Sequence, residues 1–77
     1  MQVKVIAPAF CDHSGIDDSG MLEISEYSKI KDLYKVLKIP LIIYPLLITT
    51  VNYDRAGFKA PLGEGDVVSI FWPVSGG

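Results

Sequence analysis

The sequence is short of cysteine, and this shortage limits how the fold can be stabilised. Its 77 residues include one cysteine, Cys11, so no disulfide can form within the chain. A chain of this length has surface for a single core and buries roughly 60% of the area that its unfolded form exposes. Because 49% of the residues are hydrophobic and 21% are charged, the composition predicts one folded domain over residues 1–77.

Basic clusters and long apolar runs are also scarce, which argues against two classes of partner. The net charge is −2 and no Lys/Arg cluster exceeds "KIK" at residues 29–31, so the chain lacks a basic face to neutralise nucleic-acid phosphates. The longest apolar run, "IPLIIYPLLI" at residues 39–48, holds two prolines and is about half as long as a membrane-spanning helix. No signal-like segment opens the chain, and a cytoplasmic location is expected.

Motifs for catalysis, phosphate binding and metal binding are not recognisable. There is no G-x-x-x-x-G-K-[ST] loop, and "GEG" at residues 63–65 lies in a turn before a strand, the wrong context for a dinucleotide motif. Cys11, Asp12 and His13 are adjacent in sequence, whereas a catalytic Cys and His usually meet from distant positions. One Cys and one His fall short of the four ligands of a structural zinc site. A solvated loop is therefore expected here.

Apolar spacing predicts two opening strands followed by one helix. Residues 1–10 begin with alternating polar and apolar side chains, and "MLEIS" at residues 21–25 suits a second strand after a loop rich in Asp, Ser and Gly. Ser28 is the expected N-cap of the helix, and Pro40 is expected to stop it. The buried face of the helix follows the spacing i, i+3, i+4 and i+7, with Ile30, Leu33, Tyr34 and Leu37.

The second half of the chain predicts more strands. "LLITTVNY" at residues 46–53 has the β-branched content of a strand, "NYDRAG" at residues 52–57 reads as a turn, and "FKAP" at residues 58–61 as a short edge strand. "VVSIFW" at residues 67–72 is apolar enough for a central strand. The order predicts an α+β domain with one helix on one face of a small mixed sheet.

The last five residues, "PVSGG" at 73–77, are expected to form a flexible projecting tail. A terminal carboxylate is ionised at neutral pH and resists nucleophiles until it is activated, for example as an acyl adenylate. Glycine has no Cβ, so Gly76 and Gly77 could pass through a narrow channel toward a nucleotide. Because the chain has no phosphate-binding loop of its own, this function requires a partner that uses ATP. The alternative is a frayed end without function.

The stretch "TTVNYDRAGFKAPLGEGDVVSIFWPVSGG", residues 49–77, resembles the C-terminal half of the ubiquitin-like sulfur carriers of the MoaD/ThiS family. Those proteins share a "VN" strand end, a "PL.(D/E)GD.V" turn and a terminal Gly-Gly. The ending "F-x-P-V-S-G-G" is more similar to MoaD, the small subunit of molybdopterin synthase, than to ThiS. The resemblance implies a β-grasp fold, in agreement with the predicted order of elements.

The resemblance also implies a function. Gly77 would be adenylated by an E1-like adenylyltransferase (MoeB/ThiF type) that uses ATP, with Gly76 needed for threading, and then converted to a thiocarboxylate by a persulfide donor. In the molybdopterin branch the sulfur goes to a pterin precursor in the large subunit, MoaE. The carrier is not itself an enzyme and binds no cofactor. A carrier for thiamine, a tungsten cofactor or tRNA thiolation, a protein modifier, and a plain β-grasp interaction module stay open as alternatives.

Apolar residues near the tail are candidates for contact with a partner. Residues 39–48 fit either ordinary core with a loop packed over the helix end, or an exposed patch that docks on another protein. Trp72, which precedes Pro73, is expected to be a packing anchor that fixes where the tail begins. The predicted contact residues are Phe58, Phe71, Trp72, Pro73, Val74 and Ser75.

Overall fold

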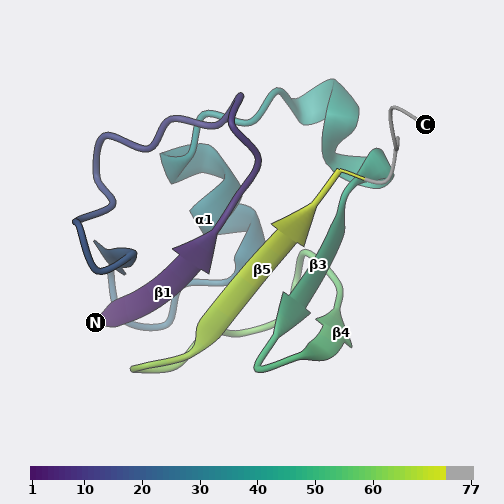
Figure 1. Cartoon of the computed structure of the whole chain (residues 1–77). Helices are drawn as coiled ribbons and strands as arrows, with labels where there is room; N and C mark the ends of the chain where they lie inside the picture. Colours follow the sequence, from purple (N-terminus) through teal and green to yellow (C-terminus); the bar gives the residue numbers. More distant parts are fainter. Residues whose placement is uncertain (73–77) are drawn as a thin grey trace.

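The computed structural model describes residues 1–72, which form a sheet with one α-helix against one of its faces (Figure 1). The α+β class and the predicted order of elements are confirmed. Among the described residues, no helix has the length and apolar character needed to cross a bilayer. The elements are β1 (Gln2–Ile6), β2 (Met21–Glu23), α1 (Ile30–Val36), the 3₁₀-helix η1 (Leu41–Leu46), β3 (Ile48–Val51), β4 (Asp54–Ala56) and β5 (Val67–Phe71).

The five strands lie in the order β2-β1-β5-β3-β4, so the last strand is central, as its apolar sequence predicted. β5 pairs in parallel with β1, with Val5 opposite Val68, and antiparallel with β3, with Thr49 opposite Ile70. The outer pairs, β1–β2 and β3–β4, are antiparallel. This mixed sheet, covered by one helix, is the β-grasp arrangement.

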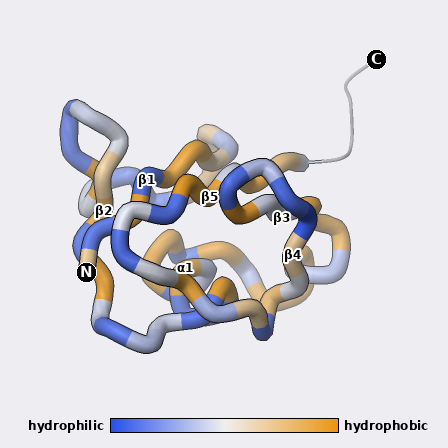
Figure 2. The backbone as a smooth tube through the Cα atoms, turned by 90° about the horizontal axis from the view of Figure 1, so that it is seen from below, coloured by the Kyte–Doolittle hydropathy of each residue, from blue (hydrophilic) through white to orange (hydrophobic). Residues whose placement is uncertain are grey.

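The core lies between α1 and the sheet. Alternation along β1 and β5 turns every second side chain toward α1. Hydrophilic residues gather outside the core, in the β1–β2 loop and the β3–β4 turn (Figure 2). Burying one side chain the size of valine, leucine or isoleucine stabilises the fold by roughly 1.5–3 kcal/mol. The largest fully buried side chains are Ile30, Leu33, Leu37, Val3 and Val68.

The start of α1 differs from the prediction, because Lys29 is the N-cap residue in place of Ser28. The Ser28 hydroxyl donates to the Ser25 carbonyl (2.6 Å), and the Lys29 N–H donates to the Asp32 carboxylate (2.8 Å). Two further N–H groups at the helix start donate to carbonyls of the 58–61 segment, at 3.0 and 2.7 Å. The exposed donors of the first turn therefore find tertiary partners and need no serine cap.

The same contact explains why the predicted edge strand at residues 58–61 is wrong. This segment lies along the start of α1, where Ile30 donates to Ala60 and Lys31 donates to Phe58. The edge strand is instead β4, within the residues predicted as a turn. Asn52 and Tyr53 both have positive φ (52° and 73°) and form a two-residue turn of the kind that closes a tight hairpin.

The helix ends at Val36, four residues before Pro40. Ile39 donates its N–H to the Tyr34 carbonyl and Lys38 donates to the Lys35 carbonyl, at 3.0 and 3.1 Å. These two bonds form a Schellman motif. Its left-handed residue is Lys38 (φ 56°), at a position where glycine is the usual residue because a Cβ is strained there.

Tyr34 links the helix to the rest of the domain. Its buried hydroxyl shares a hydrogen bond with the Thr49 hydroxyl of β3, and its ring meets the Tyr44 ring of η1 edge-on, with centroids 4.8 Å apart. Burial raises the pKa of the Tyr34 phenol. The phenol is therefore neutral at physiological pH and can act as donor or acceptor in this contact.

The helix end gives the first prediction. Lys38→Gly should raise the free energy of unfolding by about 0.5–1 kcal/mol, since relief of left-handed strain outweighs the greater freedom of glycine in the unfolded chain. The change also removes an ion pair between Lys38 and Asp12 (3.6 Å, Lys38 78% exposed), and such exposed pairs contribute little. Urea unfolding measures the effect. Lys38→Ala is the control, because it removes the ion pair but keeps the Cβ; an equal rise in both variants would contradict the prediction.

Candidate functional site

The chemistry predicted for this chain depends on what lies at the end of β5. Phe71 and Trp72 are the last described residues and are 50% and 37% exposed. Val68 and Ile70 are buried toward α1, so alternation puts Phe71 on the opposite face of the sheet. Because β5 is paired on both sides, its end has a fixed position in the domain.

Exposed apolar residues of β1 and of the loop after it lie near Phe71 and Trp72 at the end of β5. Ile6 pairs with Ser69, which places Ile6 on the same outer face as Phe71, and it is 50% exposed. The Phe10 ring meets the Trp72 ring edge-on, with centroids 5.7 Å apart. Gathered exposed apolar side chains mark interaction surfaces. We call this cluster of four residues the β5-end patch: Ile6, Phe10, Phe71 and Trp72.

Two of the four residues of this patch were not predicted from the sequence. Phe71 and Trp72 were predicted as contact residues, whereas Ile6 and Phe10 were assigned to the first strand without a role. A signal for Ile6 was present, because the outward positions of β1 are otherwise polar, Gln2 and Lys4. An apolar residue at the third outward position departs from that pattern and indicates a contact surface.

The predicted contact residue Phe58 lies elsewhere. It is 46% exposed in the loop that follows β4 and lines a cavity of about 370 Å³ with Leu41, Tyr44 and Pro45. Phe71 and Trp72 do not line this cavity, so Phe58 belongs to a different group of exposed residues. The apolar run at residues 39–48 divides between its two interpretations: Ile39 is core, whereas three residues of η1 are at least half exposed, namely Leu41, Ile42 and Leu46.

The remaining predicted site residues lie outside the described part of the chain. Gly77 is the predicted activation site, and Gly76 is expected to help the tail thread into the partner. The other three are predicted contact residues, and all five lie within the expected flexible tail. What the structure describes is the strand that leads to them and the apolar surface around its end. The five residues are Gly77, Gly76, Pro73, Val74 and Ser75.

Cys11 is buried, where a solvated loop was expected. It is 6% exposed and packs in the core, because the loop after β1 turns back over α1, where Asp12 donates its N–H to the Leu37 carbonyl (2.8 Å). Burial raises the pKa of the Cys11 thiol, which keeps it protonated and unreactive at neutral pH. His13 Nε2 donates to the Pro8 carbonyl (2.9 Å). Within residues 1–72, no three His, Cys, Asp or Glu side chains are placed to hold a metal ion.

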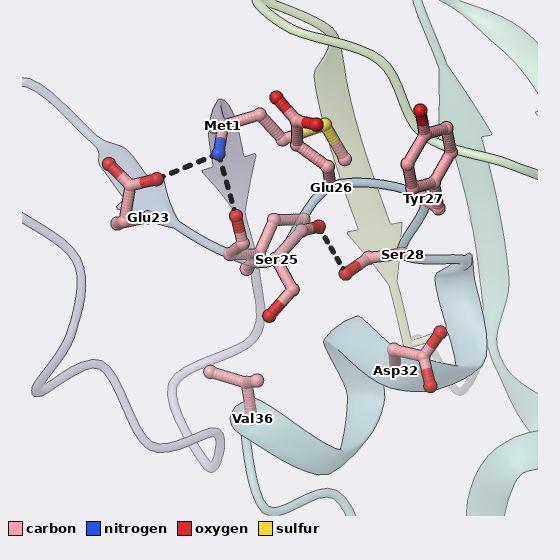
Figure 3. Close-up of a pocket in the computed structure, with 9 residues that line it drawn as sticks. Met1, Glu23, Ser25, Glu26, Tyr27, Ser28, Asp32 and Val36 are labelled. Carbon is pink, nitrogen blue, oxygen red and sulfur yellow. Dashed lines mark hydrogen bonds and ion pairs between the residues drawn. The ribbon is translucent and has the colours of Figure 1, made fainter.

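A cavity of about 760 Å³ lies at the other end of the sheet, by the start of β1 (Figure 3). The Met1 amine donates to the Glu23 carboxylate (2.7 Å) and to the Ile24 carbonyl (2.8 Å). This contact raises the pKa of the amine and lowers the pKa of Glu23. Two further carboxylates, Glu26 and Asp32, line the cavity. Because β1 and β5 are parallel, the length of the sheet separates this acidic cavity from the β5-end patch.

Comparison with known proteins connects the end of β5 to a family. A model of the ThiS family matches residues 15–77. The structure is similar to the crystal structure of SAMP1 from Haloferax volcanii, with a TM-score of 0.67 and 18% identity over 100% of both chains. At that identity the likeness concerns the fold alone, and it confirms the predicted β-grasp architecture. No curated protein matches the chain. Since the family match covers most of the chain and both glycines, the chain belongs to the ThiS family of non-catalytic, ubiquitin-like sulfur carriers.

Proposed function

We propose that this sulfur carrier works through Gly77, whose carboxylate is activated with ATP by an E1-like adenylyltransferase of the MoeB/ThiF type. The observation that carries the proposal is the family match, which runs from residue 15 through Gly76 to Gly77. The geometry of the described residues supports it, because the central strand leads toward these glycines and ends in an exposed apolar patch. We assign the loading of sulfur to Gly77.

Three chemical steps load the sulfur. The Gly77 carboxylate oxygen attacks the α-phosphorus of ATP, and pyrophosphate leaves. The terminal sulfur of a partner's persulfide then attacks the acyl carbon, and AMP leaves, which gives an acyl disulfide. A second thiol attacks the partner's sulfur in that disulfide; the S–S bond breaks, the thiocarboxylate leaves, and the two partner thiols end as a disulfide.

The β5-end patch serves in this proposal as the docking surface for the activating enzyme. Five residues follow Trp72, and even a fully extended segment of five residues spans at most about 18 Å. The adenylation site of the partner must therefore lie within that distance of the end of β5. A docking contact through Phe71 and Trp72 would bind the partner where the chain can reach, and glycine at residues 76 and 77 would allow close approach to the nucleotide.

We propose molybdopterin synthesis as the pathway, with the large subunit MoaE as acceptor. The ending "FWPVSGG" supports this choice, because Phe71 and Pro73 match the aromatic and proline of the MoaD-like tail. Sulfur delivery to thiamine or tRNA, and attachment of the chain to lysine as a modifier, share the same activation step. The acceptor that co-purifies with the thiocarboxylated chain distinguishes these pathways.

The proposal predicts the mass of the protein isolated from its host. Under non-reducing purification from sulfur-replete cells, a fraction of the chain should show the mass gain for exchange of one oxygen for sulfur, located at Gly77 by fragmentation. Intact-mass spectrometry measures this fraction.

A variant with one alanine appended after Gly77 is the matched control, since it keeps the fold but moves the carboxylate. The mass gain should disappear in this variant with no change in thermal stability. Free carboxylate alone in the unaltered chain would overturn the carrier proposal. Adducts on lysine would assign the same activated glycine to protein modification.

The docking role predicts the kinetics of Phe71→Thr. Loss of a central aromatic contact should raise the KM for the carrier in adenylation about tenfold, a shift typical of a hot-spot residue. The kcat should stay unchanged, because Phe71 lies outside the reacting group. Threonine keeps the β-branched character that suits a strand, and ATP–pyrophosphate exchange with the activating enzyme measures both constants.

Val36→Thr provides the control for this measurement. Val36 is 44% exposed on α1, in the layer opposite the outer face that carries Phe71. Its substitution should leave KM and kcat as they are. An equal rise of KM in both variants, or none in Phe71→Thr, would contradict the role of the β5-end patch.

A further inference from the structure

A second surface lies between η1 and the loop after β4, at the same end of the sheet as the β5-end patch, since Ile48 pairs with Phe71 and Thr49 pairs with Ala56. Two adjoining cavities of about 370 and 330 Å³ share Tyr44, Pro45 and Phe58 as lining residues. Each reaches the lower end of the size range of ligand sites. We call them together the η1 groove. Their size suits one or two large side chains of a partner.

The walls of the η1 groove are held in place by the fold. The Tyr44 ring packs edge-on against the buried Tyr34 ring, and Phe58 lies in a segment whose carbonyl accepts the Lys31 N–H (2.7 Å). Leu41 nevertheless remains 75% exposed and Phe58 46% exposed. The groove is therefore preformed, and its end at Leu41, Tyr44, Pro45 and Phe58 is apolar. A side chain bound there would gain burial without a large ordering cost.

Basic residues are concentrated in the part of the sequence that forms the groove, although the chain is acidic overall. Residues 29–59 contain six of the seven Lys and Arg residues but two of the nine Asp and Glu residues. Arg55 lines the groove itself, and the exposed Lys59 follows Phe58 directly. Neither Arg55 nor Lys59 forms an ion pair with any residue in the 1–72 range. Charge complementarity selects an acidic partner for this surface.

The groove also adjoins a sheet edge. β4 is the last strand in the sheet order, and in the described part of the chain its outer side pairs with no other strand. Arg55 and Ala56 of β4 line the groove. An extended peptide beside β4 would add backbone hydrogen bonds to the apolar and charged contacts.

We propose that the η1 groove binds an extended acidic segment of a partner protein, with a large aliphatic side chain of that segment seated among Leu41, Tyr44, Pro45 and Phe58. Arg55 and Lys59 bind carboxylates on either side of this side chain. The proposal goes beyond sulfur loading, because no contact in it involves Gly77. A carrier with this site has one surface at the end of β5 and a second, chemically different one beside β4.

A designed peptide tests the groove in the full chain. The probe is a fluorescein-labelled peptide with a leucine pair flanked by aspartates, and its binding is measured by anisotropy and by amide shifts in NMR. Saturable binding should shift signals of residues 41–46 and 55–58 and should weaken as salt rises. Peptides with lysines in place of the aspartates, or serines in place of the leucines, should bind at least tenfold more weakly.

Exposed residues provide variants that leave the core intact. Leu41→Ser should weaken binding of the probe about tenfold through lost apolar burial, and Arg55→Gln about threefold through loss of one charge. Lys4→Gln, on the outer face of the sheet, is the matched control and should have no effect. Equal binding of the lysine peptide, no saturable binding, or shifts centred on the β5-end patch or on the cavity at Met1 would overturn the proposal. Failure here leaves the mass gain at Gly77 untouched, so the two proposals are tested separately.

Discussion

The pairing of β5 between β1 and β3 is the constraint on which the rest of the structure depends. β5 is the last described strand but occupies the centre of the sheet, so the two ends of the described chain must meet before the core can close. Val68 and Ile70 then lie under α1 with 0% and 3% exposure. The same pairing fixes the position of Phe71 and Trp72. The residues that follow Trp72 therefore start from a strand that is paired on both sides.

The hydrogen bonds at the start of α1 determine the structure on the β4 side of the sheet. The carbonyls of Phe58 and Ala60 accept N–H groups of the first helical turn, which holds the 58–61 segment against the helix. This segment therefore cannot extend the sheet, and β4 remains its edge. Phe58 consequently faces η1, and the space between them is the η1 groove. One pair of backbone hydrogen bonds thus accounts for the missing serine cap, the short edge strand and a preformed apolar surface.

Charge divides the molecule in a way that the net value of −2 conceals. The acidic loops and the cavity at Met1 lie toward β1 and β2, whereas Arg55 and Lys59 lie by β4. The β5-end patch lies between these regions and is apolar. In the proposed function one protein loads the carrier and another unloads it, and surfaces that differ in charge would let each partner recognise its own region.

Local patterns in the sequence were sufficient for much of the fold. The alternation in β1, the spacing of Ile30, Leu33 and Leu37, and the apolar run of β5 each reflect burial of one face, a property that neighbouring residues share. The resemblance at residues 49–77 pointed to the MoaD/ThiS carriers, and the ThiS family model matches the chain. Wrong predictions concerned Ser28, the segment 58–61 and the solvation of Cys11. In each case a hydrogen bond or a packing contact with a distant segment outweighed the local propensity.

The sequence by itself determined the class of fold and the central place of the last described strand, because periodicity needs no knowledge of distant contacts. The chemistry expected of Gly76 and Gly77 comes from a short motif and stays a prediction. Only the tertiary structure decided that Ile6 and Phe10 join Phe71 and Trp72, and that Phe58 instead joins η1. Those groupings follow from strand register and from backbone donors that find carbonyls far along the chain. Neither the strand register nor a distant hydrogen-bond partner can be predicted from the residues adjacent in sequence.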